Sequence, residues 1–117
     1  MQLRRLGKTD LTVSEIGFGC GDAAGLMTRG DHAKQLAVAK LALRSGVNYF
    51  DTASAYGDGR SETNLGAVLK ETGAKVGLAT KVRLAPADLS RLKKATIDSV
   101  NQSLKRLGRP RPYIAFS

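Results

Sequence analysis

The sequence has no tryptophan, one cysteine and one histidine. A lone Cys20 excludes an intrachain disulfide, and with His32 as the sole histidine the chain lacks the ligands for a cysteine and histidine zinc site. No stretch approaches the roughly 18 apolar residues that a membrane span requires. The first residues lead into no apolar segment typical of a secretion signal. We therefore expect a cytoplasmic protein with no metal centre and no membrane partner.

Aromatic residues are also few, at three tyrosines and three phenylalanines in 117 residues. The core must therefore be mainly aliphatic and rich in alanine. With 42% hydrophobic and 25% charged residues, the composition is that of an ordinary folding sequence. A chain of this length allows one domain.

Acidic residues are scarce in the second part of the chain. Residues 1–74 carry a net charge of +1, whereas residues 75–117 carry +8. A basic segment can bind nucleic acid. Five of its ten basic residues, however, fall within one predicted helix, where a charge run usually forms the solvated face. We therefore expect no nucleic-acid partner, and duplex binding that weakens steeply with salt would indicate the opposite.

The N-terminal segment, residues 1–15, predicts a β-hairpin, because short apolar and polar alternation surrounds the turn cluster at residues 7–10. Residues 16–108 then repeat a strand and a helix three times. Apolar runs start near residues 16, 47 and 76, and a helical pattern follows each run. Parallel strands with helical crossovers follow from this order.

The predicted helices have recognisable ends. In the first helix, Asp31 is a suitable N-cap and Gly46 a suitable residue beyond the C-terminus. Its buried face is predicted from the stripe of Ala37, Val38, Leu41 and Ala42. The third helix is predicted to run from about Asp88 to Leu107 without a break.

The loops favour a barrel over an open nucleotide-binding sheet. A G-x-G-x-x-G fingerprint starting at Gly17 would need glycine at position 22, which is Asp22. Polar side chains instead gather where the second and third strands end, at Asp51 and Lys81. In parallel barrels that end of the strands is the catalytic face.

These strand-end residues suggest a proton-transfer site. Neighbouring parallel strands lie about 5 Å apart, so Asp51 and Lys81 can form a buried ion pair. Tyr56, in the loop after Asp51, can lean over that pair. A nearby ammonium group stabilises a phenolate, which makes a tyrosine useful as an acid or base. The residues themselves also allow a purely structural ion pair.

Several segments resemble the aldo-keto reductase family in sequence order. The run NYFDTASAYG at residues 48–57 is similar to the segment around that family's catalytic aspartate and tyrosine. Residues 6–19 resemble its hairpin and first barrel strand, residues 79–81 its catalytic-lysine strand, and residues 103–108 its third helix.

The resemblance implies a (β/α)₈ barrel of the TIM type that reduces aldehydes or ketones to alcohols with NADPH and without a metal. It implies that Tyr56 donates the proton, that Lys81 assists it, and that Asp51 holds Lys81. Gly19, Cys20 and Gly21, together with Asp51, would contact the cofactor. The family's fourth catalytic residue is a histidine after residue 108, and this chain has none there.

The resemblance also implies an incomplete barrel, because a whole one takes roughly 250 residues. Residues 109–117 read as a divergent tail that stops where a fourth strand is expected. We therefore expect an N-terminal part of a reductase, inactive by itself, either truncated or frame-shifted, with NADPH or NADH left open. The alternative is a non-catalytic binding or interaction protein on the same partial scaffold. Unpaired sheet edges predict self-association.

Overall fold

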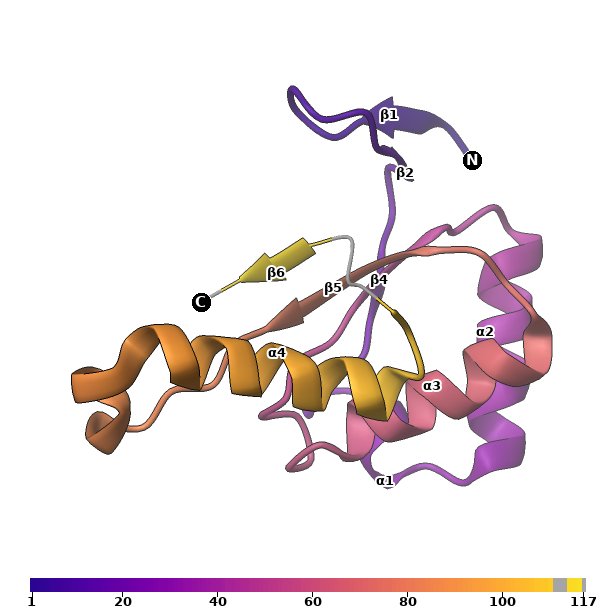
Figure 1. The fold of residues 1–117 in the computed structure, drawn as a ribbon. Helices are drawn as coiled ribbons and strands as arrows, with labels where there is room; N and C mark the ends of the chain where they lie inside the picture. The colour runs from indigo at the N-terminus through magenta and orange to yellow at the C-terminus, as the bar shows by residue number, and fades with distance from the viewer. Residues whose placement is uncertain (111–113, 117) are drawn as a thin grey trace.

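The computed structural model describes residues 1–110 and 114–116. It is an α/β fold in which an N-terminal hairpin precedes a parallel sheet with helices along one side (Figure 1). The strands are β1 (Leu3–Arg5), β2 (Thr12–Ser14), β3 (Phe18–Gly19), β4 (Tyr49–Asp51), β5 (Gly77–Lys81) and β6 (Ile114–Phe116). The helices are α1 (Leu26–Arg29), α2 (His32–Arg44), α3 (Arg60–Thr72), the 3₁₀ helix η1 (Pro86–Arg91) and α4 (Leu92–Leu107).

The predicted hairpin is confirmed, with β1 and β2 antiparallel and Gly7 in the left-handed region at φ 57°. Asn48, just before β4, fixes it to the sheet. The Asn48 side chain accepts a hydrogen bond from the Ser14 N–H at 2.7 Å and donates to the Thr12 carbonyl at 3.1 Å. The hairpin therefore lies at the amino ends of the parallel strands, opposite the loops that follow them (Figure 1).

The sheet has the order β3-β4-β5-β6, with every neighbouring pair parallel. The three predicted strand and helix units are present, and the tail differs from its prediction. Ile114–Phe116, expected to diverge from the fold, forms a fourth strand in register with Ala79–Lys81. The remaining tail positions 111–113 and 117 lie outside the described residues.

The core lies between the sheet and the helices. Phe50 and Leu78 point from the centre of the sheet toward Leu65 and Val68 of α3, and all four are buried. The Phe18 ring stacks on Phe50 with centroids 4.9 Å apart. As expected from the composition, the rest of the core is aliphatic.

The long third helix differs from its prediction in being divided. Asp88 accepts a hydrogen bond from the Ala85 N–H at 2.8 Å, which caps the short 3₁₀ turn that begins at Pro86. Arg91 then departs from helical backbone angles at φ −143°. Helix α4 begins only after this break, and it ends as predicted at Gly108 in the left-handed conformation.

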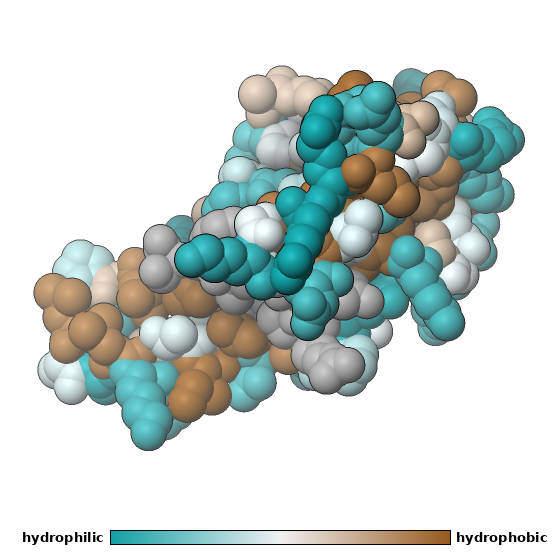
Figure 2. Space-filling model, turned by 90° about the horizontal axis from the view of Figure 1, so that it is seen from above, coloured by the Kyte–Doolittle hydropathy of each residue, from teal (hydrophilic) through white to brown (hydrophobic). Residues whose placement is uncertain are grey.

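The start of α4 is poorly covered. Leu89 is 70% exposed and Leu92 46% exposed. Figure 2 shows hydrophobic side chains gathered at that end of the molecule. In the described part of the chain, β3 and β6 each have one strand neighbour. None of the described helices is long and apolar enough to cross a membrane.

We expect the 117-residue chain alone to self-associate, because exposed apolar side chains and open strand edges favour association. Light scattering at increasing protein concentration measures this directly. The double variant Leu89→Lys/Leu92→Lys should associate less than the parent chain. A monodisperse monomer with a cooperative thermal transition would contradict the expectation.

Candidate functional site

The candidate site is built on the carboxyl ends of β4 and β5. Asp51 is the last residue of β4 and lies in register with Ala79 of β5, two residues before Lys81. Successive strand side chains alternate between the faces of a sheet. The side chains of Ala79 and Lys81 therefore share the face of Asp51, and the side chain of Thr80 points to the helices.

Lys81 binds two oxygens at this end of the sheet. Its Nζ donates to Asp51 Oδ1 at 2.6 Å and to the Thr52 carbonyl at 2.9 Å. The sequence predicted the ion pair but placed it in the interior. Both side chains are about one-third exposed, at 35% for Lys81 and 34% for Asp51. The pair lies on the sheet face opposite the helices, and water therefore reaches it.

Tyr56 lies beside this pair. The Lys81 Nζ is 5.1 Å from the centroid of the Tyr56 ring. Gly21 also lies near the ring, because a β-carbon built on it would lie 3.8 Å from Tyr56. The structure therefore brings together Asp51, Tyr56 and Lys81, the three residues singled out from the sequence.

The loop that carries Tyr56 is held by backbone geometry. Gly57, Asp58 and Gly59 all have positive φ, at 59°, 54° and 87°. This left-handed turn leads directly into α3. Asp22 accepts a hydrogen bond from the Gly57 N–H at 3.1 Å and ties the loop to the segment after β3. Glycine at two of the three positions avoids the cost of this conformation.

The electrostatics of the pair keep Lys81 charged. Partial burial lowers the pKa of Lys81. The hydrogen bond to Asp51 and the negative charge of Asp51, with a contribution from the Tyr56 phenol, outweigh burial, so the pKa is raised above its usual value. A fixed positive charge therefore stays beside the phenol at neutral pH.

Gly19, Cys20 and Gly21 lie next to this cluster, at the end of β3. Nothing lies within 4 Å of a β-carbon built on Gly19, so that side of the backbone is open. The Cys20 side chain is 1% exposed and packs in the core. Only its backbone can meet a ligand at this end of the sheet, and its N–H is bonded to the Asp51 carbonyl at 2.9 Å.

The buried Cys20 thiol should be inert. Burial raises its pKa to about 12, with Asp51 adding to the rise and Lys81 opposing it. The thiolate is the reactive form of cysteine. We expect alkylation by iodoacetamide at mildly alkaline pH to be at least about a hundredfold slower in the folded chain than in urea. Similar rates in the two conditions would show that Cys20 is accessible.

His32 lies away from the cluster. It is the first residue of α2, its side chain is 51% exposed, and its Nε2 lies 2.7 Å from Glu71 Oε2. No cluster of three or more potential metal ligands occurs among the described residues.

Sequence reasoning missed a second polar centre behind the sheet. Glu62 lies in the first turn of α3, where a carboxylate commonly interacts with the helix dipole at the surface. Its side chain is nevertheless fully buried, where it accepts from Thr80 Oγ1 at 2.5 Å and from Arg106 Nε at 2.6 Å. A signal was available, because position 62 precedes Leu65 and Leu69 at core helical spacing.

The comparisons with known proteins agree with this geometry. The model of the "Aldo/keto reductase family" matches residues 15–114. The aldo-keto reductase YhdN of Bacillus subtilis is 34% identical over 114 residues, which cover 92% of this chain and 34% of that protein. The chain spans about a quarter to a third of the length of the curated relatives that it matches.

Solved structures share the same fold. An aldo-keto reductase from Bacillus halodurans, in its holo form, is 35% identical, with a TM-score of 0.72 over 93% of this chain and 37% of that one. An aldo/keto reductase from Klebsiella pneumoniae, in complex with NADP and acetate, has a TM-score of 0.71 over 89% of this chain and 35% of that one. At 23% identity, the second likeness concerns the fold alone.

Proposed function

Because the chain belongs to the aldo/keto reductase family, we propose that it carries the proton-transfer residues of an NADPH-dependent enzyme that reduces aldehydes or ketones to alcohols. The observation that supports this most is the contact of Asp51, Lys81 and Tyr56 at the carboxyl ends of two parallel strands. That end of a barrel is where active sites form. The chain spans only part of its relatives, so the activity is proposed for the completed barrel.

Each of the three residues has a role that its environment supports. Tyr56 donates a proton to the carbonyl oxygen of the substrate, and the positive charge of Lys81 stabilises the phenolate that remains. Asp51 accepts a hydrogen bond from Lys81 at 2.6 Å and so fixes the position of the ammonium group. Lys81 is suited to this role because its raised pKa keeps it protonated.

The residues at the end of β3 fit the nicotinamide end of NADPH. The nicotinamide ring would have to come close to the protein backbone there. Gly19 permits this close approach, because it has no side chain and the space beside it is open. Gly19, Gly21, the Cys20 backbone and Asp51 would hold that end. When bound, NADPH supplies the hydride. The adenosine phosphate has no assigned partner among the described residues.

The position of the lone histidine bears on the choice between a reductase and a non-catalytic binding protein. The family's fourth catalytic residue is a histidine, and His32 lies outside the cluster, paired with Glu71. The chain therefore supplies three of the four residues. A non-catalytic binding protein on the same scaffold would need neither the histidine nor the cofactor, and that reading is the second candidate.

We expect the 117-residue chain alone to bind NADPH weakly, with a dissociation constant above about 100 μM, since its assigned contacts reach one end of the cofactor only. Fluorescence titration of NADPH measures the constant. A constant near 1 μM would contradict this expectation and would place a phosphate site within the chain.

The function itself is tested by completing the barrel. Residues 1–108 are joined to the C-terminal remainder of YhdN, a relative of 34% identity. We expect the chimera to oxidise NADPH when a reactive aldehyde is added. A folded chimera that binds NADPH and shows no turnover would favour the non-catalytic alternative.

A further inference from the structure

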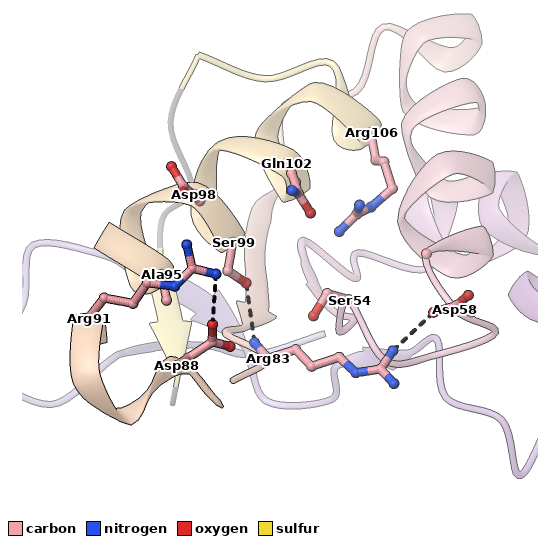
Figure 3. A pocket seen from close by; sticks show the side chains of 11 residues that line it. Ser54, Asp58, Arg83, Asp88, Arg91, Ala95, Asp98, Ser99, Gln102 and Arg106 are labelled. Atoms are coloured by element: carbon pink, nitrogen blue, oxygen red, sulfur yellow. Dashed lines mark hydrogen bonds and ion pairs between the residues drawn. The ribbon is translucent and has the colours of Figure 1, made fainter. Parts of the chain in front are cut away.

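A pocket of about 300 Å³ lies outside the catalytic cluster, between the start of α3, the segment after β5 and the inner side of α4 (Figure 3). Every part of its wall belongs to described residues of this chain. Its volume is at the lower end of the range for small-molecule sites. It is lined by Ser54, Asp58, Gly59, Arg83, Asp88, Arg91, Ala95, Asp98, Ser99, Gln102 and Arg106.

The wall of the pocket is polar. Only Ala95 and Gly59 lack a polar side chain, and the lining includes three arginines and three aspartates. An apolar ligand would leave these groups without partners, at a cost in free energy. The occupant must therefore be small and hydrophilic.

Arg106 is the fixed donor of the pocket. Its Nε donates to the buried Glu62 at 2.6 Å, which leaves the two terminal amino groups of the guanidinium outside that pair. Figure 3 shows this guanidinium directed into the pocket, beside Gln102 and above Ser54. Gly59 makes room for it, since a β-carbon there would lie 3.0 Å from Arg106 Cδ. A prepositioned guanidinium suits a phosphate or carboxylate.

The other two arginines are held loosely. Arg83 pairs with Asp58 at 2.9 Å, but the two side chains are 62% and 91% exposed. Arg91 reaches Asp88 only at 3.4 Å. Both arginine side chains are about 60% exposed, and ion pairs of such side chains contribute little, so an incoming anion can replace them. The amino end of α3 at Gly59 adds a favourable dipole for negative charge.

The balance of charges in the pocket further restricts the class of ligand that fits it. The aspartates offset the arginines, so a bare inorganic anion gains little net attraction. Gln102 lines the same wall, and its amide group can donate to and accept from hydroxyl groups, whereas the Asp98 carboxylate is held by Lys94 at 2.7 Å. We propose that this pocket binds a small phosphomonoester of a polyol, with the phosphate on Arg83, Arg91 and Arg106 and the hydroxyl groups on Gln102.

The pocket is distinct from the reductase site. It lies on the helix side of the sheet, whereas Asp51 and Lys81 share the opposite face. Ser54 connects the two sites, since it lines the pocket and donates to the Lys81 carbonyl at 3.1 Å. Tyr56 does not line the pocket. Binding in the pocket should therefore not depend on Tyr56, and the failure of one proposal leaves the other intact.

Calorimetry with glucose 6-phosphate as the probe tests the proposal, with glucose and inorganic phosphate as comparison ligands. We expect glucose 6-phosphate to bind at least about tenfold more tightly than either comparison ligand. Its phosphate can bind the arginines while its hydroxyl groups bind Gln102, whereas each comparison ligand offers only one of these two kinds of group. The double variant Arg83→Gln/Arg91→Gln should weaken this binding by at least about tenfold. Gln102→Leu should weaken it without changing the charge.

The matched control is Lys40→Gln/Lys70→Gln, which removes the same charge from exposed helix positions outside the pocket. It should keep the affinity within about twofold. Circular dichroism checks that each variant is folded. Equal weakening by both double variants would reveal general charge attraction, and an unchanged affinity in the pocket variants would place the ligand elsewhere. Loss of binding in Tyr56→Phe would assign it to the reductase site. Any of these three results, or no binding by the parent chain, would overturn the proposal.

Discussion

Replacing Tyr56 by phenylalanine should lower the turnover of the completed barrel by at least about a hundredfold, with little change in NADPH affinity. The substitution keeps the ring that lies near Gly21 and Lys81 and removes the proton donor. Positioned acid catalysis contributes typically about 10² to 10⁴-fold to a rate. Steady-state kinetics with a reactive aldehyde and a cofactor titration provide the two measurements.

Tyr49→Phe is the matched control for this experiment. Tyr49 belongs to the same strand as Asp51, two residues earlier, so its side chain points to the same face. Burial, together with the charge of Asp51, raises the pKa of Tyr49. Its phenol has no proposed role, so the variant should keep turnover within about threefold. Near-normal turnover in a folded Tyr56→Phe chimera would refute the catalytic role of Tyr56.

Lys81→Met distinguishes chemistry from structure at the same site. In a fully buried ion pair, loss of the cation would cost much stability by leaving the carboxylate uncompensated. Asp51 is one-third exposed, so water compensates it in part, and the loss should be modest. The rate should fall strongly, because the phenolate loses the charge that stabilises it. A variant that loses stability and keeps its rate would indicate a purely structural ion pair.

The largest loss of stability should come from Arg106→Leu. This change leaves Glu62 without its cation, and Glu62 has no exposed surface. Removing one partner of a buried ion pair costs about 3 to 5 kcal/mol of unfolding free energy. That is a large part of the 5 to 15 kcal/mol typical of a whole domain. Urea unfolding followed by circular dichroism gives the difference.

The double variant Glu62→Gln/Arg106→Leu should recover most of that stability. It removes both charges, and the glutamine carbonyl can still accept the hydrogen bond from Thr80 Oγ1. The two single changes should therefore be strongly non-additive. If Arg106→Leu costs less than about 1 kcal/mol, or if the double variant is no more stable, the ion pair does not hold α3 to α4.

The sequence predicted that Asp51, Tyr56 and Lys81 lie together, because the local pattern of the chain determines where each of them falls. Asp51 and Lys81 end two apolar runs, and parallel pairing brings such ends together. The face of α2 was predicted wrongly, since Val38 and Leu41 are exposed, whereas Gln35 and Ala39 are buried. Alanine-rich helices carry a weak apolar stripe, so tertiary packing decided which side faces the core.

Other features depended on contacts between distant segments. Arg106 meets Glu62 across 44 positions, and nothing in either local pattern indicates the partner. The pocket has the same origin, because its wall combines a loop, the start of α3 and the side of α4. The strand at Ile114–Phe116 was missed because nearby prolines dominated the interpretation of the tail.

Thr80 and Lys81 are adjacent in β5, yet Thr80 binds Glu62 on one side of the sheet and Lys81 binds Asp51 on the other. An inserted or deleted residue within Gly77–Lys81 would exchange these faces and direct the ammonium group toward the helices. Changes in chain length should therefore be tolerated in the segment before Pro86 and not inside the strand. Positions of β5 that face the helices and positions that face away from them can therefore be varied separately. Changes at the first set should alter thermal stability, and changes at the second set should alter reactivity.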